Sequence, residues 1–226
     1  MLRALLFIVA LLCTLPAYAQ SADYMGYLEQ LININGYSPE QSPHNERSRE
    51  VLSDRVIDKT NHVVGEVRDV FLNDQGEIMR LDADFNRLKI GTSRLVLDYK
   101  DMNIEPSGNG YKLGITDDQL IDMFPRLKAL QKAYKPAQPL YALQSFQGAA
   151  LNDTQGHKLG QVEDVLFDKL GGRADFLFVS LTYKTMSGRT LALPFDALFY
   201  APGYKKPQIT APDALVQAML EVAGRK

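Results

Sequence analysis

Cysteine and histidine are scarce in this sequence, which has one cysteine and three histidines among 226 residues. The single cysteine, Cys13, lies in an N-terminal segment that we predict to be removed. The mature chain then has no thiol for a disulfide, a nucleophile or a cysteine zinc site. The motifs G-x-S-x-G and H-E-x-x-H and a glycine-rich phosphate loop are also absent from the sequence. We therefore predict no catalytic, cofactor-binding or metal-ligating residue and no bound cofactor.

The sequence also lacks a strong excess of one charge and a long apolar run. Its formal net charge of −2 gives no overall electrostatic argument for binding nucleic acid or an anionic membrane. No later segment reaches the roughly 20 apolar residues that span a bilayer. The lysines are scattered rather than interleaved with aromatic residues, which favours a solvated face over an RNA-binding platform. They include Lys89, Lys100, Lys112, Lys184, Lys205 and Lys206.

The N-terminus has the pattern of a secretory signal peptide. Arg3 precedes an apolar run over residues 4–15, and Ala17 and Ala19 supply the small residues of an A-x-A cleavage site. Leu12 before Cys13 lacks the small side chain of a lipoprotein cleavage site. We predict that residues 1–19 are a signal peptide, that cleavage follows Ala19, and that the mature protein is periplasmic and is not stably inserted in the membrane.

An internal repeat organises the remainder of the chain. Residues 56–76 and 151–171 align at a constant offset of 95 with seven identical positions in 21. The identical pairs include Asp58/Asp153, His62/His157, Gly65/Gly160 and Asp69/Asp164. Ordinary composition would give only about one or two matches, so this pattern indicates a duplication.

The alignment continues with small gains and losses of residues. Gly110-Tyr111-Lys112 aligns with Gly203-Tyr204-Lys205, and Ile115-Thr116 aligns with Ile209-Thr210. Thr116 and Gln119 have capping-box spacing, and Thr210 with Asp213 is a looser parallel. Each unit is therefore predicted to end in a helix.

Apolar residues bounded by turn residues predict short strands over 63–72, 78–85 and 174–183. Many short strands in a small unit favour a barrel, because closure removes exposed sheet edges. The predicted fold class is mainly β with short helices, in the form of two small β-barrels in tandem, each closed by a C-terminal helix.

Two other segments are predicted to contain helix. Tyr24, Tyr27, Leu28 and Leu31 have helical spacing within residues 23–35 before Gly36, either as a helix packed on a barrel or as a partner-binding arm on a polar tether. Residues 126–134 could extend the first closing helix past Pro125.

The repeated strings around Gly65-Glu66-Val67-Arg68-Asp69-Val70 and Gly160-Gln161-Val162-Glu163-Asp164-Val165, followed by Leu193-Pro194-Phe195, resemble PRC-barrel domains. This resemblance implies a small β-barrel that docks on other macromolecules without a shared catalytic site. The predicted division is a signal peptide at 1–19, a helix and polar linker at 20–48, PRC-barrel-like domains at 49–124 and 142–222, and a helical, proline-containing linker at 125–141.

The repeated carboxylates and histidines are the residues that could carry chemistry. Asp69 and Asp164 lie among apolar neighbours, where a carboxylate can be a tuned acid or can accept backbone hydrogen bonds, and we favour the structural role. His62 and His157 each follow an aspartate by four residues at a polar turn, and a solvated turn is favoured over a metal site. His44 adds no further pattern.

The function predicted from the sequence is a non-catalytic, exported adaptor that uses tandem domains to bind a protein in the cell envelope. The alternative is a small-ligand-binding protein or an enzyme with a site in the groove between the domains, using Asp69, Asp164 and tyrosines such as Tyr111 and Tyr204. A purely structural envelope protein is a third possibility.

Overall fold

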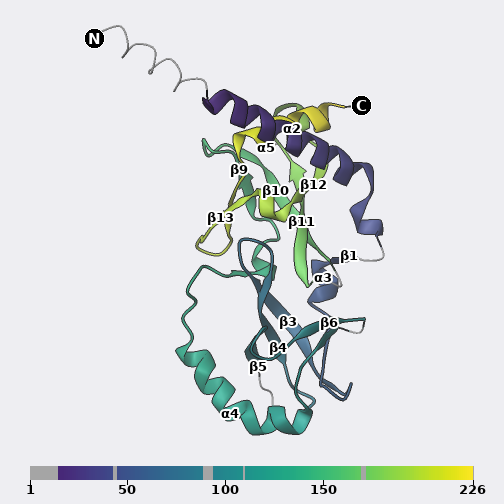
Figure 1. Ribbon diagram of the computed structural model, residues 1–226, viewed down its shortest axis with the longest axis vertical. Coiled ribbons are helices and arrows are strands. Elements are labelled where there is room, and N and C mark those ends of the chain that lie inside the picture. The colour runs from purple at the N-terminus through teal and green to yellow at the C-terminus, as the bar shows by residue number, and fades with distance from the viewer. Residues whose placement is uncertain (1–14, 43–44, 89–93, 109, 169–171, 226) are drawn as a thin grey trace, which may run out of the picture.

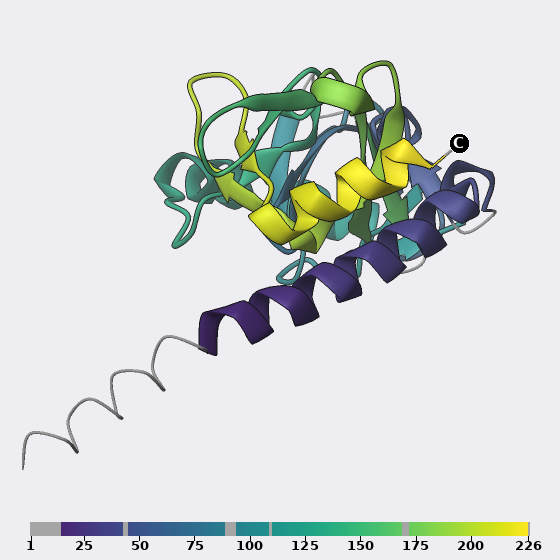
Figure 2. The same ribbon diagram turned by 90° about the horizontal axis from the view of Figure 1, so that it is seen from above.

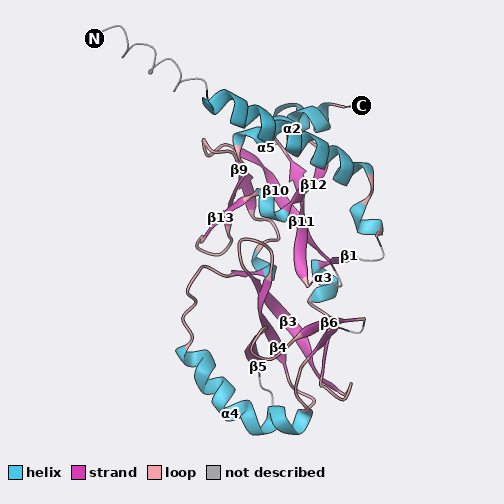
Figure 3. Ribbon diagram, viewed as in Figure 1, coloured by secondary structure: helices cyan, strands magenta, loops and turns pink. Residues whose placement is uncertain are grey.

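The computed structural model describes residues 15–42, 45–88, 94–108, 110–168 and 172–225. The protein is mainly β, with two seven-stranded sheets stacked along its long axis and helices at both ends (Figure 3). This confirms the predicted β-rich class. His44 and residues 1–14 of the predicted signal peptide lie outside the described residues, and residues 15–19 belong to the first helix.

The first unit is defined here as β2 to β7 with helix α4. Its sheet has the order β5-β4-β3-β2-β7-β6, in which β2 and β7 are parallel and the other neighbours are antiparallel. Its elements are β2 (Arg55–Ile57), β3 (Val63–Leu72), β4 (Ile78–Asp84), β5 (Arg94–Asp98), β6 (Glu105–Ser107), β7 (Gly110–Lys112) and α4 (Asp117–Ala133).

The second unit is defined as β9 to β14 with helix α5, and its sheet has the equivalent order β12-β11-β10-β9-β14-β13. Here β9 and β14 form the parallel pair. The elements are β9 (Ala150–Asn152), β10 (Lys158–Asp168), β11 (Arg173–Leu181), β12 (Thr190–Pro194), β13 (Phe199–Ala201), β14 (Gln208–Thr210) and α5 (Asp213–Gly224). Short 3-10 turns, Lys184–Met186 and Phe195–Ala197, follow β11 and β12.

The long strands and the first closing helix agree with the sequence prediction. β3 covers the predicted residues, and β4 and β11 differ from prediction by one or two residues at their ends. α4 begins after the N-cap Thr116, whose hydroxyl accepts from the Gln119 amide while the Gln119 side chain accepts from the Thr116 amide. It runs on through Pro125 to Ala133, as predicted.

The predicted alignment is wrong near the end of the second unit. β2 pairs with β7 at Val56 and Tyr111, whereas β9 pairs with β14 at Leu151 and Ile209. The structural counterpart of Tyr111 is therefore Ile209 and not Tyr204. Thr210 lies in β14, and α5 follows the N-cap Pro212 without a side-chain cap. A longer connection after β13 shifts the register, so the second Gly-Tyr-Lys string is a coincidence of composition.

The two units exchange strands reciprocally. β1 (Asn45–Arg47), which precedes the first unit, pairs with β10 of the second unit at residues 166–168. β8 (Tyr141–Ala142), which precedes the second unit, pairs with β3 of the first unit at residues 71 and 72. These pairings are related by the same offset of 95 residues as the sequence repeat. Each sheet is thus completed by the segment that leads into the other unit.

Hairpin tips make a second reciprocal contact. The Ala174 amide donates to the Gly76 carbonyl at 2.8 Å, and Gly76 lies against the Phe195 ring. In the other direction, Gly172 lies against the Tyr99 hydroxyl and the Pro106 ring. The units consequently meet through a pseudo-symmetric interface rather than through a flexible connection alone.

Helix α2 (Leu15–Gly36) lies across the end of the second unit, beside α5 (Figures 1 and 2). Its Leu28 and Leu31 are buried, and the Tyr24 hydroxyl donates to Glu221 of α5. Asn35 donates to the Ala192 carbonyl and accepts from the Ala192 amide at 3.1 and 2.9 Å, which satisfies both backbone groups of that residue of β12. The predicted helix therefore packs on the second unit.

No helix within the described part of the chain combines the length and the apolarity that crossing a membrane requires.

Candidate functional site

Asp69 and Asp164 occupy equivalent bulges in β3 and β10. The ladder shifts between Val67 and Asp69 in the first unit and between Val162 and Asp164 in the second. Each aspartate accepts the amide hydrogen of the next residue, Val70 or Val165, at 2.9 Å. A bulge disrupts the ladder and leaves backbone groups that need other partners. These carboxylates satisfy such groups.

Both carboxylates also contact the segment that leads into the other unit. Asp69 accepts from the Gln144 amide at 3.3 Å, in the 3-10 turn after β8. Asp164 accepts from the Ser48 hydroxyl at 2.5 Å, in the short helix α3 (Ser48–Val51) after β1, and pairs with Arg47 at 3.5 Å. The repeated aspartates thus hold the exchanged strands at the junction.

The environments of the two carboxylates differ in charge. Asp164 pairs with Arg47 of the exchanged strand β1. At the equivalent position of β8 the residue is Ala142, so β8 supplies no cation to Asp69. Asp82 lies opposite Asp69 on β4. Burial raises the pKa of Asp69 to about 6, and Asp82 adds to the increase, while the amides of Gln144 and Val70 partly oppose it.

We expect Asp69→Asn to be more stable than the parent at pH 7 and similar to it near pH 4. Because the folded pKa is above that of an exposed aspartate, the folded state binds the proton more tightly, and stability decreases as the pH rises from about 4 through 6. A shift of about two units corresponds to about 3 kcal/mol. Urea denaturation of both proteins across this pH range measures the difference.

Asp69→Ala is the matched control, because it removes the charge and also the oxygen that accepts two amides. We expect it to be less stable than Asp69→Asn by about 1–3 kcal/mol at every pH tested. Equal stability of the two variants, or a parent whose stability is flat between pH 4 and 6, would contradict this account of Asp69.

The other repeated aspartates shape turns before β3 and β10. Asp58 is fully buried and accepts from the amides of Thr60, His62 and Asp117. Burial acts to raise the pKa of Asp58, but the hydrogen bonds outweigh it and lower the pKa below its usual value. Asp153 likewise accepts from the amides of Gln155 and His157.

The two histidines lie at these turns with largely exposed side chains. The His157 ring contacts Asp153 at 2.9 Å, and the His62 ring lies 4.0 Å from Asp58. Ligand atoms of Asp58, His62 and Asp117 lie within 4.8 Å of one another. The Asp58 oxygens already accept amide hydrogens, which fits a turn better than a metal site.

We therefore expect the melting temperature to be unchanged by a chelator or by a reductant. Metal release would remove binding free energy from the folded state and lower the melting temperature. Thermal unfolding with and without each reagent is the measurement. A decrease of several degrees with chelator, abolished in His62→Gln, would instead assign a metal to this turn.

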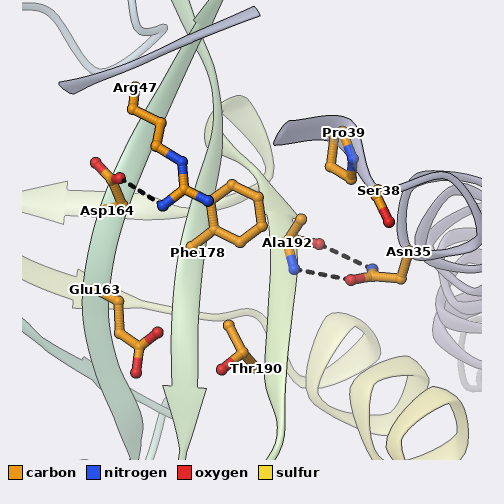
Figure 4. A pocket seen from close by; sticks show the side chains of 9 residues that line it. All are labelled: Asn35, Ser38, Pro39, Arg47, Glu163, Asp164, Phe178, Thr190 and Ala192. Atoms are coloured by element: carbon orange, nitrogen blue, oxygen red, sulfur yellow. Dashed lines mark hydrogen bonds and ion pairs between the residues drawn. The ribbon is translucent and has the colours of Figure 1, made fainter. Parts of the chain in front are cut away.

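A polar pocket of about 400 Å³ lies on the outer face of the second sheet (Figure 4). Arg47 enters it from β1, beside Asp164 and with its guanidinium 6.0 Å from the centre of the Phe178 ring. Asn35 and Ala192 close one side through their paired hydrogen bonds. The other lining residues are Ser38, Pro39, Glu163 and Thr190.

An ion pair occupies the equivalent place in the first unit. Phe178 and Ala192 are register partners in the second sheet, as Asp82 and Val96 are in the first. There the Asp82 carboxylate, which is buried, accepts from Arg94 at 2.6–2.8 Å. In the second unit the neutral Phe178 stands in the place of Asp82, and Arg47 lies beside its ring.

The tyrosines of the alternative prediction do not meet at a site. Tyr111 is buried in the first unit, whereas Tyr204 is 96% exposed on the loop between β13 and β14. A cavity of about 290 Å³ lies beside Asp164, lined by β10 and by the segments that lead into the two units. Its lining is Ser48, Leu52, Leu143, Gln144, Gln147, Asp164 and Val165. Sequence reasoning missed Arg47, because only the strand exchange brings it to Asp164. It also missed Phe178, which lies opposite Asp164 across the β10–β11 hairpin.

The fold and these contacts define a two-unit β protein whose repeated carboxylates hold backbone amides at turns and at the junction. Residues 139–216 match the family model of the PRC-barrel domain, in one copy. The match begins just before β8 and ends within α5, and so includes the sheet of the second unit. A comparison with curated proteins gives no match to the chain.

Proposed function

We propose that this protein is a non-catalytic, exported scaffold that binds another protein of the cell envelope through the outer surfaces of two tandem PRC-barrel-like domains. The observation that carries the proposal is the use of the repeated carboxylates. Asp58, Asp69, Asp153 and Asp164 all accept backbone amides in turns, bulges and the junction. These contacts support a structural role for the carboxylates that the sequence repeat singles out.

The first unit is proposed to be a second PRC-barrel-like domain, with each sheet curled into a small barrel closed by its helix. Three features support this: the sequence repeat, the equivalent strand order, and the reciprocal pairing of β1 and β8. Strand exchange and hairpin-tip contacts occupy much of the junction. A macromolecular partner is therefore expected on the outer faces rather than between the domains.

Export is proposed from the signal-peptide pattern, and it predicts Gln20 as the mature N-terminus. Ala17 and Ala19 supply the small residues that a signal peptidase accepts. Cleavage there would shorten α2 but keep Tyr24, Leu28 and Leu31, which hold it on the second unit. N-terminal sequencing of the periplasmic protein decides this, and a mature form that retains Arg3 would contradict it.

The scaffold function is tested by crosslinking and affinity capture from the periplasm with the full-length, tagged protein. We expect a defined envelope protein to be enriched over a tag-only control under at least one growth condition. Capture of nothing above that control under several growth conditions would overturn the proposal.

The pocket in Figure 4 favours one alternative function, the binding of a small polar ligand. Its charged lining residues, Arg47, Glu163 and Asp164, could bind a ligand that carries both an amine and hydrogen-bond acceptors. A thermal-shift screen of metals and metabolites discriminates the two functions. A compound that raises the melting temperature of the parent but not of Thr190→Phe, which would fill the pocket, would favour the alternative.

A further inference from the structure

α4 is longer than α5. It has 17 residues and continues beyond Pro125 to Ala133, whereas α5 has 12 residues and ends at Gly224. Figure 1 shows α4 passing beneath the first sheet and then rising along its side. Leu130 of α4 is 55% exposed, and the C-cap Tyr134 is 40% exposed, with the Arg80 guanidinium 3.7 Å from the centre of its ring. Together with the half-buried Leu127 they form an apolar stripe, a feature that marks interaction surfaces.

The stripe faces a groove between α4 and β5. The groove has a volume of about 520 Å³ and is lined mainly by apolar side chains. From α4 these are Met123, Leu127, Leu130 and Tyr134, and from the first sheet and its following turn they are Val96, Leu97 and Met102. A groove of this kind accepts the apolar face of an amphipathic segment.

At Val96, β5 cannot pair with an added strand, because both backbone groups of this residue already have partners. The Val96 amide donates to Gln131 of α4 at 3.3 Å, and the Val96 carbonyl accepts from Arg80 at 3.0 Å. On the second unit Asn35 of α2 satisfies both backbone groups of Ala192, the counterpart of Val96. In that unit a whole amphipathic helix, α2, lies over the closing helix and the edge strand. An occupant of the groove would therefore bind through side chains.

Charge defines what such an occupant must carry. Three basic residues line the groove, Arg126 of α4, Lys135 just beyond the helix and Arg80 of β4, and no acidic residue lies between 125 and 135. The opposite rim carries Asp98 and Asp101. The groove is therefore basic along α4 and acidic along β5, and an occupant must present its carboxylates on the α4 side. The arrangement favours a protein segment over a lipid surface.

We propose that the α4–β5 groove binds an acidic amphipathic segment of the partner protein. Its apolar side chains would contact Leu127, Leu130 and Tyr134, and its carboxylates would face Arg126 and Lys135. This inference rests on the proposed scaffold function and names the surface and the chemistry through which that function acts.

A photo-crosslinking amino acid at position 130 of the full-length protein, expressed in the periplasm, tests the groove. The same group at position 204 is the control, because Tyr204 is exposed on a loop of the second unit. We expect a protein adduct at position 130 well above that at position 204. Sequencing of the crosslinked peptide should identify a segment with apolar residues at helical spacing and an excess of carboxylates.

Charge reversal supplies the second readout. Arg126→Glu with Lys135→Glu, both in the lining of the groove, should lower the yield of the position-130 adduct about tenfold, equivalent to about 1.4 kcal/mol of binding free energy. The control variant, Lys59→Glu with Lys158→Glu, has the same change of net charge. Lys59 is exposed in a turn and Lys158 is exposed in β10, so this variant should leave the yield unchanged. Thermal unfolding of each variant establishes that it is folded.

The remaining outcomes contradict the inference in distinguishable ways. An adduct with a second copy of the chain or with lipid, or one that survives the charge reversal, would overturn the proposed occupant. If the adduct yield at position 130 is no higher than at position 204 while affinity capture recovers a partner, the groove is not the binding site, and the proposed scaffold function is not contradicted. Failure of both experiments would overturn both proposals.

Discussion

Gly160→Val is expected to lower the free energy of unfolding by about 3 kcal/mol or more, a large part of the stability of an ordinary domain. A Cβ atom on Gly160 would lie 2.3 Å from the Ser180 carbonyl oxygen and 3.0 Å from a Val179 methyl group. At the equivalent Gly65 it would lie 2.7 Å from the Asp84 carbonyl oxygen. In both units the neighbouring strand approaches so closely that the backbone itself would have to move.

Gly65→Val should therefore destabilise the protein in the same way, and somewhat less than Gly160→Val because its clash is less severe. Gly108→Val is the control, since no atom lies within 4 Å of the Cβ position there. Urea denaturation of the three variants gives the comparison. A Gly160→Val protein within about 0.5 kcal/mol of the parent, as typical for a surface substitution, would show that the described strand spacing is wrong.

Tyr141→Ala is expected to cost about 3 kcal/mol, at the lower end of the range for truncating a large buried side chain. Tyr141 is 6% exposed and its ring lies 5.7 Å from the ring of Tyr200 and 6.3 Å from that of Phe146. The residue belongs to β8, which pairs with β3 of the first unit, whereas Tyr200 belongs to the second unit and Phe146 ends the 3-10 turn that leads into it. Both units should therefore lose stability together.

Tyr204→Ala is the matched control, because this side chain is 96% exposed and its removal should change stability by less than about 0.5 kcal/mol. Urea denaturation followed by circular dichroism measures both variants. A Tyr141→Ala protein that unfolds in two separated steps would contradict the expectation, because it would mean that the first unit stays folded without its exchanged strand.

The units themselves could be predicted because their signals are local and repeated. β3 has apolar residues bounded by an Asn-Asp-Gln-Gly turn, and the α4 start is encoded in the spacing of Thr116 and Gln119. The repeated aspartates could be identified as partly buried from their apolar neighbours. Such features depend on a few adjacent residues, and the sequence repeat presents most of them twice.

The strand exchange could not be predicted, because β1 and β8 are too short for a periodic pattern. β1 has the sequence Asn-Glu-Arg and β8 has only two residues. Their pairing with β10 and β3 depends on contacts distant in sequence. The pocket containing Arg47 and Phe178 depends on that exchange, so it was hidden as well. The alignment error near Tyr204 has a related cause, since a loop of altered length shifted the register between short strands.

Reciprocal exchange of β1 and β8 implies that neither sheet is complete without the other unit. Native-state hydrogen exchange in increasing urea, followed by mass spectrometry of peptides from β3 and β10, tests this most directly. We expect the most protected amides of the two strands to converge on one opening free energy, because a single cooperative transition exposes both. Exchange of β3 at urea concentrations where β10 stays fully protected would show that the units open independently, and it would contradict a single interlocked scaffold.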